Sequence, residues 1–483
     1  MIRSSSELDR VFGPESTGDT EELRASSSRK TYVRSQLQIA EDNDRAKGLK
    51  LTAREAHWLY GWEILAKVAE DGTAPLISLP NEPAATLVAR REALNLSQRH
   101  VAQAAGVDES VVNEAERPGK VSPIRDLVKI AQVLALNEYL LGYLRGAGGD
   151  KALGVRLREM NRADAQGFSE TDVLKLSQAA WVIAAQSDLL KLLSSAQEMV
   201  RSQFKFDENY SYPTYERGFA LARKARSLLG IPPKQPIHSI RQILEQTLGI
   251  PVIQDRLAER FAGATIANGR DRGIVVNERG QNSNVWVRRM TIAHELGHLL
   301  WDADTRLNKL RVDRYEGLEA SFAADVEHQK SNDATEIRAN AFAVAFLAPP
   351  EALKELSRRT SSDHSLLATV MQQFGISATA AKYHLRNVTK RDVLRIQNQQ
   401  LPSPSDEWKA DENLSVDFFP LRETTISRRG AFAGLVARAF EKGLISEDTA
   451  AAHLQTTVER FREQLKSILD VGNAVPSKEF ALA

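Results

Sequence analysis

Two histidines and a glutamate stand close together in the middle of the sequence, within the segment MTIAHELGHLLW at residues 290–301. His294 and His298 are four residues apart, so on a helix both side chains project from the same face. Two imidazoles at that spacing can hold one Zn²⁺, and Glu295 beside them can act as a general base toward a water that the metal activates. The pattern therefore predicts a zinc site of the metallopeptidase type.

The opposite face of the same segment is apolar, with Val285, Ile292, Leu296 and Leu299 at helical spacing. This spacing predicts a helix that is buried on its back. Gly297 costs about 1 kcal/mol relative to Ala in a helix interior, and its bare side would let another backbone approach the helix closely. A core helix that carries two polar histidines is the alternative interpretation.

A catalytic zinc needs a third protein ligand and an open fourth position. Residues 334–350 have the pattern of a second helix, which ends at a pair of prolines. Glu336 is the best candidate for the third ligand, and Asn340, one turn later, is placed to support a ligand by hydrogen bonding. Alternatively, Glu336 is a solvated glutamate at a helix start. Four other side chains are rival third ligands: Asp302, Asp325, Glu327 and His328.

The segments RRMTIAHELGHLLW and EIRANAFAVAFLAP together resemble the ImmA/IrrE family of metallopeptidases in motif, order and spacing. The resemblance covers roughly residues 215–350. It implies that His294, His298 and Glu336 are the zinc ligands and that Glu295 is the catalytic glutamate. It also implies a protein substrate, such as a helix-turn-helix repressor whose cleavage relieves repression.

Two features beside these helices could assist a peptidase. Tyr315 lies between them in sequence and could donate to the oxyanion of a tetrahedral intermediate, although such a tyrosine more often serves packing. Residues 263–277 predict a β-hairpin with a turn at Asn268-Gly269. A short sheet beside the metal helix would have an exposed edge, which could pair with an extended substrate strand.

Residues 84–143 resemble an Xre-type helix-turn-helix domain, with Ser97 as a helix cap and Gly106 at the tight turn. The resemblance implies that residues 108–116 face the major groove. Between residues 87 and 136, seven Lys or Arg stand against six acids, so DNA binding would be weak or need a dimer. A helical bundle for protein contacts is the alternative. Four residues are the expected DNA contacts: Gln98, Arg99, Ser110 and Asn113.

Composition sets further limits on the 483-residue chain. It contains no Cys, which excludes a disulfide framework and a thiolate zinc site and fits a reducing cytoplasm. The net charge of +1 gives no global attraction to nucleic acid, so any DNA contact must come from a local patch. We find no run of eighteen apolar residues, which argues against a membrane span.

We therefore expect a mainly α, multi-domain, cytoplasmic protein in which a zinc metallopeptidase is fused to a DNA-binding domain. The peptidase domain should be α+β and zincin-like with a small sheet, and a homodimer is a further expectation. One alternative is a transcriptional regulator whose peptidase-like domain is a sensor or dimerisation platform; another is a toxin–antitoxin or phage-defence component. The expected parts are a partly disordered extension with one helical segment (1–80), the helix-turn-helix domain (84–143), a helical linker (144–205), the metallopeptidase domain (206–350), a second helix-turn-helix-like module (351–400) and a helical C-terminal region (401–483).

Overall fold

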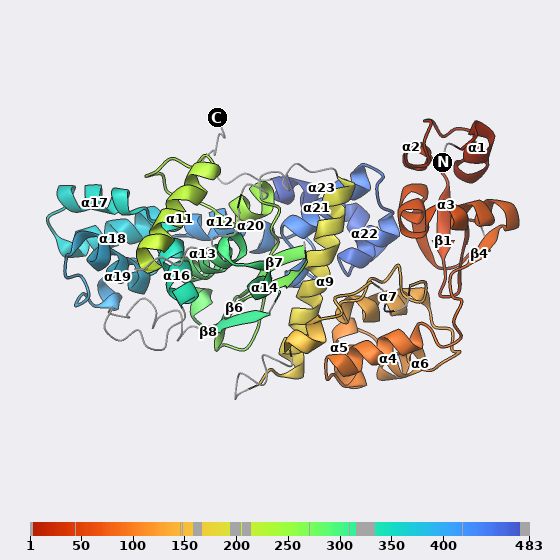
Figure 1. Cartoon of the computed structure of the whole chain (residues 1–483), viewed down its shortest axis with the longest axis horizontal. Coiled ribbons are helices and arrows are strands. Elements are labelled where there is room, and N and C mark those ends of the chain that lie inside the picture. The colour runs from red at the N-terminus through yellow and green to blue at the C-terminus, as the bar shows by residue number, and fades with distance from the viewer. Residues whose placement is uncertain are drawn as a thin grey trace. The chain divides into compact units, whose positions relative to one another are not determined.

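The fold is mainly helical, with two four-stranded sheets among the described residues, as the sequence predicts. The chain forms two compact units (Figure 1): unit 1 comprises residues 1–194 and 419–473, and unit 2 comprises residues 195–418 and 474–483. In the helices that are described, no stretch has both the length and the apolar character to cross a membrane. The computed structural model describes residues 3–43, 45–144, 146, 148–157, 167–193, 204, 214–269, 271–308, 310–314, 334–417 and 419–473.

Unit 1 begins with two short helices, α1 (Ser5–Phe12) and α2 (Glu21–Ser27). Leu8, Val11 and Phe12 of α1 are buried, so this part of the range expected to be partly disordered is ordered among the described residues. Helix α1 packs on α3 (Ala53–Asp71), which begins after a cap at Thr52 whose side chain accepts from the backbone N–H of Glu55. A small antiparallel sheet in the order β3-β1-β2-β4 completes this part: β1 (Thr31–Arg34), β2 (Gln38–Glu41), β3 (Leu49–Thr52) and β4 (Thr73–Pro75).

Four helices follow in unit 1 over the range that resembles a helix-turn-helix domain. Ser97 caps the second of them by accepting from the backbone N–H of His100, and Gly106 ends it with a left-handed φ of 62°. This positive φ is where the chain turns sharply into the next helix. The helices are α4 (Ala84–Ala93), α5 (Gln98–Ala105), α6 (Glu109–Ala115) and α7 (Ile124–Val133).

The C-terminal helices belong to unit 1. They are α21 (Ala431–Glu441), α22 (Glu447–His453) and α23 (Val458–Asn473), and α21 packs on the long helix α9 (Glu170–Leu192). The side chain of Trp181 on α9 contacts the rings of Phe432 and His453 edge-on. The boundaries of the six parts expected from the sequence remain a prediction, because the structure divides the chain into only two compact units.

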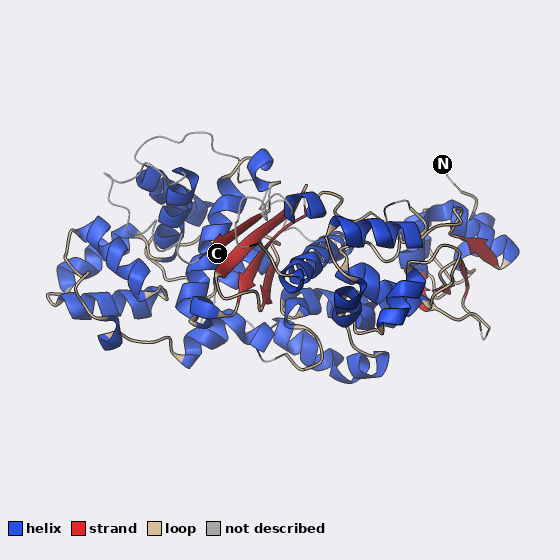
Figure 2. Ribbon diagram, turned by 90° about the horizontal axis from the view of Figure 1, so that it is seen from below, coloured by secondary structure: helices blue, strands red, loops and turns tan. Residues whose placement is uncertain are grey.

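Unit 2 contains a second sheet with the strand order β5-β7-β6-β8. Figure 2 shows its strands side by side in red. The predicted hairpin is confirmed, because β6 and β7 are antiparallel and flank a turn at Gly269. The edge of the sheet on this side is β8, which pairs with the outer side of β6. The strands are β5 (Val252–Asp255), β6 (Phe261–Asn268), β7 (Asp271–Asn277) and β8 (Arg311–Arg314).

The helix α13 (Val285–Trp301) packs on β6 and β7 and carries the two spaced histidines. The apolar back predicted for it is confirmed, since Val285, Ile292, Leu296 and Leu299 are all buried. Its neighbour α16 (Ala334–Leu347) lies between α13 and α11 (Thr214–Leu228). A Cβ on Gly297 would lie 2.9 Å from the Phe342 ring, and one on Gly218 would lie 2.5 Å from the Arg338 carbonyl, so both glycines permit close approach of α16.

The helices between residues 350 and 389 share one hydrophobic core with α13 and α16. Figure 1 shows α17 (Pro350–Arg359), α18 (Asp363–Phe374) and α19 (Ala378–Thr389) grouped together. The guanidinium of Arg289 on α13 is buried and donates to the carbonyl of Gly375, in the turn between α18 and α19. The range 351–400 therefore packs as part of unit 2.

Candidate metal centre

Three elements of unit 2 bring four potential metal donors to one place. The helix α13 supplies His294 and His298, α16 supplies Glu336 near its start, and strand β8 supplies Asp313. One donor atom from each of the four lies within 4.8 Å of all the others. The two histidines are buried, and the carboxylates of Glu336 and Asp313 have exposed fractions of 25% and 13%. The cluster therefore lies at the boundary between the core and solvent.

The distances between these donors resemble the edges of a tetrahedron. In a zinc site with bonds of about 2.0–2.2 Å, neighbouring donor atoms lie about 3.3–3.6 Å apart. Glu336 Oε2 lies 3.4 Å from His294 Nε2 and 3.6 Å from His298 Nε2. Asp313 Oδ2 lies 3.3 Å from His294 Nε2, and the two Nε2 atoms are 3.0 Å apart. A nitrogen and oxygen donor set with this spacing fits Zn²⁺.

The tautomers of the two imidazoles follow from what lies behind each ring. His294 Nδ1 is 2.8 Å from Asn340 Oδ1, and His298 Nδ1 is 2.9 Å from Asp302 Oδ2. Both partners are acceptors, so each Nδ1 carries the proton and each Nε2 presents a lone pair. Two lone pairs that face each other at 3.0 Å repel unless a cation or a proton lies between them. In the metal-free chain a proton fills this place, since the pKa of His294 is raised, and a metal ion would replace that proton.

Asn340 and Asp302 support the ligands without joining the donor cluster. Asn340 is placed behind His294, as the sequence predicted for a supporting residue. Asp302 was weighed as a rival third ligand, but it contacts the far nitrogen of His298 because it directly follows the last turn of α13. Arg338 on α16 donates to the other oxygen of Asp302. Hydrogen bonds of this kind fix ring orientation in metal sites.

Glu295 is fully buried beside the histidines, on the side of the sheet. Thr265 on β6 donates its hydroxyl to Glu295 Oε2. Glu295 Oε1 has no hydrogen-bond donor among the described residues. One oxygen is thus held in place, and the carboxylate also interacts with the Asp313 side chain.

The charges around the cluster favour a cation at its centre. Burial alone would lower the pKa of His294, but the carboxylates of Asp313 and Glu336 outweigh it and raise this pKa well above its ordinary value. Burial alone would raise the pKa values of Asp313 and Glu336, but the histidines hold both below their usual range. Burial and, to a smaller extent, the Asp313 charge raise the pKa of Glu295 well above its ordinary value. The two carboxylates that stabilise positive charge at His294 would stabilise a bound cation in the same way.

The structure brings some predicted residues together and adds one that the sequence did not single out. His294, His298, Glu295, Glu336 and Asn340 meet as expected. Asp313 was missed, because its position depends on the pairing of β8 with β6, and its only sequence signal is an acid two residues before Tyr315. Four predicted candidates lie outside the described residues: Tyr315, Asp325, Glu327 and His328.

The residues expected to contact DNA are arranged differently, on α5 and α6 of unit 1. Gln98 Nε2 donates to Glu116 Oε2 at 2.7 Å, and Asn113 Nδ2 donates to Gln98 Oε1 at 3.3 Å. Arg99 and Ser110 are exposed. Two of the four predicted contacts are thus engaged within the unit, and two face solvent.

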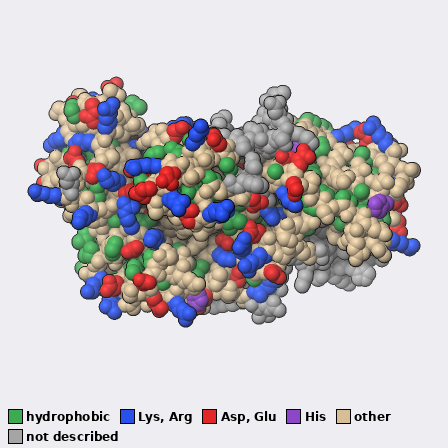
Figure 3. Space-filling view, turned by 180° about the vertical axis from the view of Figure 1, so that it is seen from behind, with side chains coloured by type: hydrophobic (Ala, Val, Ile, Leu, Met, Phe, Trp, Pro, Cys, Tyr) green, Lys and Arg blue, Asp and Glu red, His purple; other side chains and the backbone are tan. Residues whose placement is uncertain are grey.

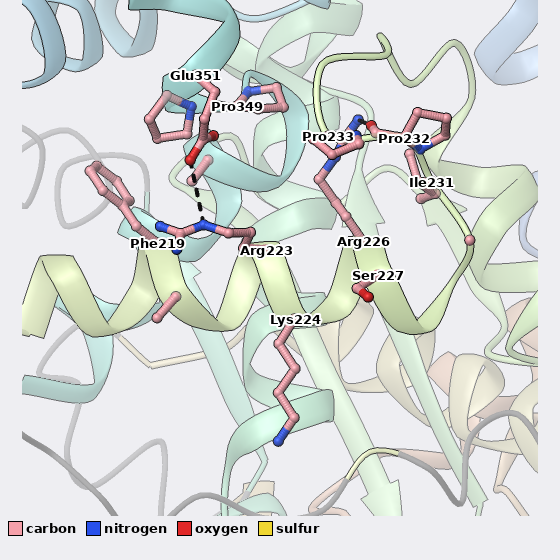
Figure 4. A pocket seen from close by; sticks show the side chains of 14 residues that line it. Phe219, Arg223, Lys224, Arg226, Ser227, Ile231, Pro232, Pro233, Pro349 and Glu351 are labelled. Atoms are coloured by element: carbon pink, nitrogen blue, oxygen red, sulfur yellow. Dashed lines mark hydrogen bonds and ion pairs between the residues drawn. The ribbon is translucent and has the colours of Figure 1, made fainter.

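A separate hollow of about 610 Å³ lies elsewhere in unit 2. Figure 4 shows it between the end of α11 and the start of α17, where Arg223 Nε pairs with Glu351 Oε1 at 3.4 Å. Its lining includes Pro232, Pro233 and Pro349 and none of the four metal donors. The hollow is therefore distinct from the metal centre.

Comparison with known proteins agrees with this geometry. The M78 peptidase model described as the IrrE N-terminal-like domain matches residues 249–386. A comparison with curated proteins finds no match. The matched range contains α13, α16, β8 and the helices up to α19, so it includes all four donors. The match supports a peptidase-like function for unit 2, and the donor cluster supports a metal ion as its cofactor.

Proposed function

We propose that this chain is a zinc-dependent endopeptidase. The observation that carries the proposal is the convergence of His294 Nε2, His298 Nε2 and Glu336 Oε2 at mutual distances of 3.0–3.6 Å, with Glu295 buried beside them. These three residues would hold the ion. Zn²⁺ supplies Lewis acidity, which activates a water and polarises a peptide carbonyl.

The chain's own residues supply the proton transfers and the alignment. Glu295 takes a proton from the attacking water on Oε1 and returns it to the leaving amide nitrogen. Thr265 holds Glu295 Oε2 so that Oε1 keeps its direction. Asn340 and Asp302 keep the two rings in the tautomer that presents Nε2.

For the substrate, we propose a regulatory protein, such as a helix-turn-helix repressor, whose cleavage changes transcription. The proposal rests on the resemblance to the ImmA/IrrE family. Co-expression of the chain with a candidate repressor tests it, and mass spectrometry would detect the cleaved partner. We expect fragments with the native chain and none with Glu295→Gln; a Glu295→Gln variant that cleaves at the native rate would contradict the proposed role of Glu295.

DNA is the proposed partner of the helix pair α5–α6. Support comes from the capped start of α5, the Gly106 turn and the exposed side chains of Arg99 and Ser110. On the face drawn in Figure 3, Lys and Arg side chains are interspersed with Asp and Glu, without a continuous basic stripe. Since DNA affinity depends on phosphate neutralisation, we expect this binding to be weak.

One observation favours a second candidate, a metal-containing regulator without turnover. Four protein donors surround the centre when Asp313 is included, and structural zinc sites have four protein ligands whereas catalytic sites keep one position open. In that case Glu295→Gln would leave every cellular effect of the protein unchanged, and chelation would leave operator binding unchanged.

A further inference from the structure

Asp313 stands at the metal centre as a fourth donor. Its Oδ2 is 3.3 Å from His294 Nε2, which is as close as the 3.4 Å of Glu336 Oε2. A zinc ion held by two imidazoles and two carboxylates has no position left for water or a peptide carbonyl. With Asp313 as a ligand, a tetrahedral site would therefore be closed to substrate.

Strand pairing places Asp313 at this point. Asp313 lies opposite Gly263 in the register of β8 with β6, and directly opposed residues in a sheet point to the same face. A Cβ on Gly263 would lie 2.9 Å from Thr291 on α13, and Thr265, two residues along β6, reaches Glu295 from that face. The face that carries Asp313 is thus the face packed on α13.

The same strand is the edge of the sheet beside the metal centre. β8 is the last strand of the sheet, is only four residues long and pairs with β6 alone among the described strands. An extended peptide that adds to a sheet needs a free edge with unpaired backbone N–H and C=O groups. Departure of β8 would release Asp313 from the metal and expose the edge of β6 in one movement.

We infer that β8 with Asp313 is a removable internal block, in which a strand occupies the edge of β6 and its carboxylate fills the open metal position. The inference rests on the proposed zinc peptidase and concerns the regulation of its site. Substrate access then requires an extended segment to replace β8 on β6, while Asp313 exchanges for water.

The test uses the full chain with Co²⁺ in place of Zn²⁺ and acetohydroxamate as the probe of an open metal position. Visible absorption reports whether the probe binds to the ion. If Asp313 occupies its position in about nine molecules of ten, Asp313→Ala should bind the probe about tenfold more tightly than the native chain. The variant should also hold Co²⁺ more weakly in a chelator competition, because it lacks one donor.

Asp304→Ala is the matched control, because Asp304 is a 78%-exposed acid of the same unit that pairs with Arg272. It should match the native chain in both measurements. If Asp313→Ala fails to fold, as judged by circular dichroism, Asp313→Asn takes its place, with a smaller increase in probe affinity because an amide oxygen is a weaker donor.

The outcomes separate this inference from the proposed function. Equal probe affinity in the native chain and the Asp313 variants, with Co²⁺ bound in both, overturns the block and leaves the metal site intact. Lost probe binding in a variant that retains Co²⁺ also overturns it. A native chain that binds neither Co²⁺ nor Zn²⁺ overturns the proposed function itself.

Discussion

The metal centre of unit 2 and the helix pair of unit 1 both contain polar residues that the sequence singled out, but the two regions use them in opposite ways. At the metal centre, the outer nitrogens of His294 and His298 are held from behind, so that both Nε2 atoms face a common point. In the helix pair, the amide of Gln98 is already hydrogen-bonded to Glu116 and Asn113, so it has few donors or acceptors left for a ligand.

The N-terminus of α5 also differs from the metal centre, because a side chain of the protein already occupies it. The Glu170 carboxylate accepts from the backbone N–H of Ser97 at 2.8 Å and pairs with His100 Nδ1 at 2.8 Å. A helix start of this kind attracts anions, and here a carboxylate of the protein already lies there. Converging lone pairs therefore mark a ligand site more securely than polar residues at the right sequence positions.

The largest expected effect comes from removing a metal ligand. His294→Ala should lower zinc affinity by more than the 10- to 100-fold that loss of a supporting hydrogen bond costs, because it removes the donor itself. His100→Ala, in the helix pair, should leave zinc content unchanged. Chelator competition on both full-length variants measures the difference, and equal affinities would remove the contrast between the two regions.

In the metal-free protein, the stability of unit 2 should depend on pH because of the charged groups at the metal centre. The pKa values of His294 and Glu295 are raised in the folded state, so the stability they contribute is complete below their ordinary values of 6.5 and 4.5 and declines as pH rises through the folded values. The pKa values of Asp313 and Glu336 are lowered, so their contribution is present above ordinary values of 3.8 and 4.5 and is lost as pH falls below them.

Between pH 4.5 and 6.5 the histidine and the two lowered carboxylates all contribute, so unit 2 should be most stable near that window. Bound zinc should remove most of the alkaline decline, because it replaces the proton at His294. Thermal melts with and without zinc measure this. A metal-free melting temperature that stays flat from pH 6 to 9 would count against the charge arrangement described for the centre.

The smallest expected effect concerns the helix pair. Gln98→Ala should lower the free energy of unfolding by about 1 kcal/mol, because a partly buried hydrogen bond to Glu116 is lost. Arg99→Ala should leave stability unchanged and, if unit 1 binds DNA, reduce the salt slope of binding by about one. The opposite pattern, with a stable Gln98 variant of altered DNA affinity, would show that Gln98 contacts DNA directly.

The spacing of residues along the sequence predicted the helix that carries the histidines. The residue that it missed, Asp313, is positioned by pairing between distant segments. The spacing of His294 and His298 is set within one helical turn, so it could be seen in the sequence. Glu336 was chosen from the pattern of a second helix, and the resemblance pointed to the same residue; the convergence of the donors supports this choice. Asp313 could not be predicted, because the partner of β6 at its outer edge is fixed only by the three-dimensional fold.

Asp302 and the first residues of the chain show the same limit. Spacing alone placed Asp302 one turn after His298, but not on the far nitrogen of the ring, where Arg338 of another helix also holds it. The polar composition of the first thirty residues suggested disorder, whereas three apolar side chains of α1 are enough to anchor it on α3.

The most direct test of the central claim is the zinc content of the full chain and two glutamate variants, measured by native mass spectrometry. The account predicts one zinc ion in the native chain and in Glu295→Gln, because Glu295 serves as a base, and weaker zinc binding in Glu336→Ala, because one of the donors is removed. A Glu336→Ala chain that holds zinc as tightly as the native protein would contradict the account.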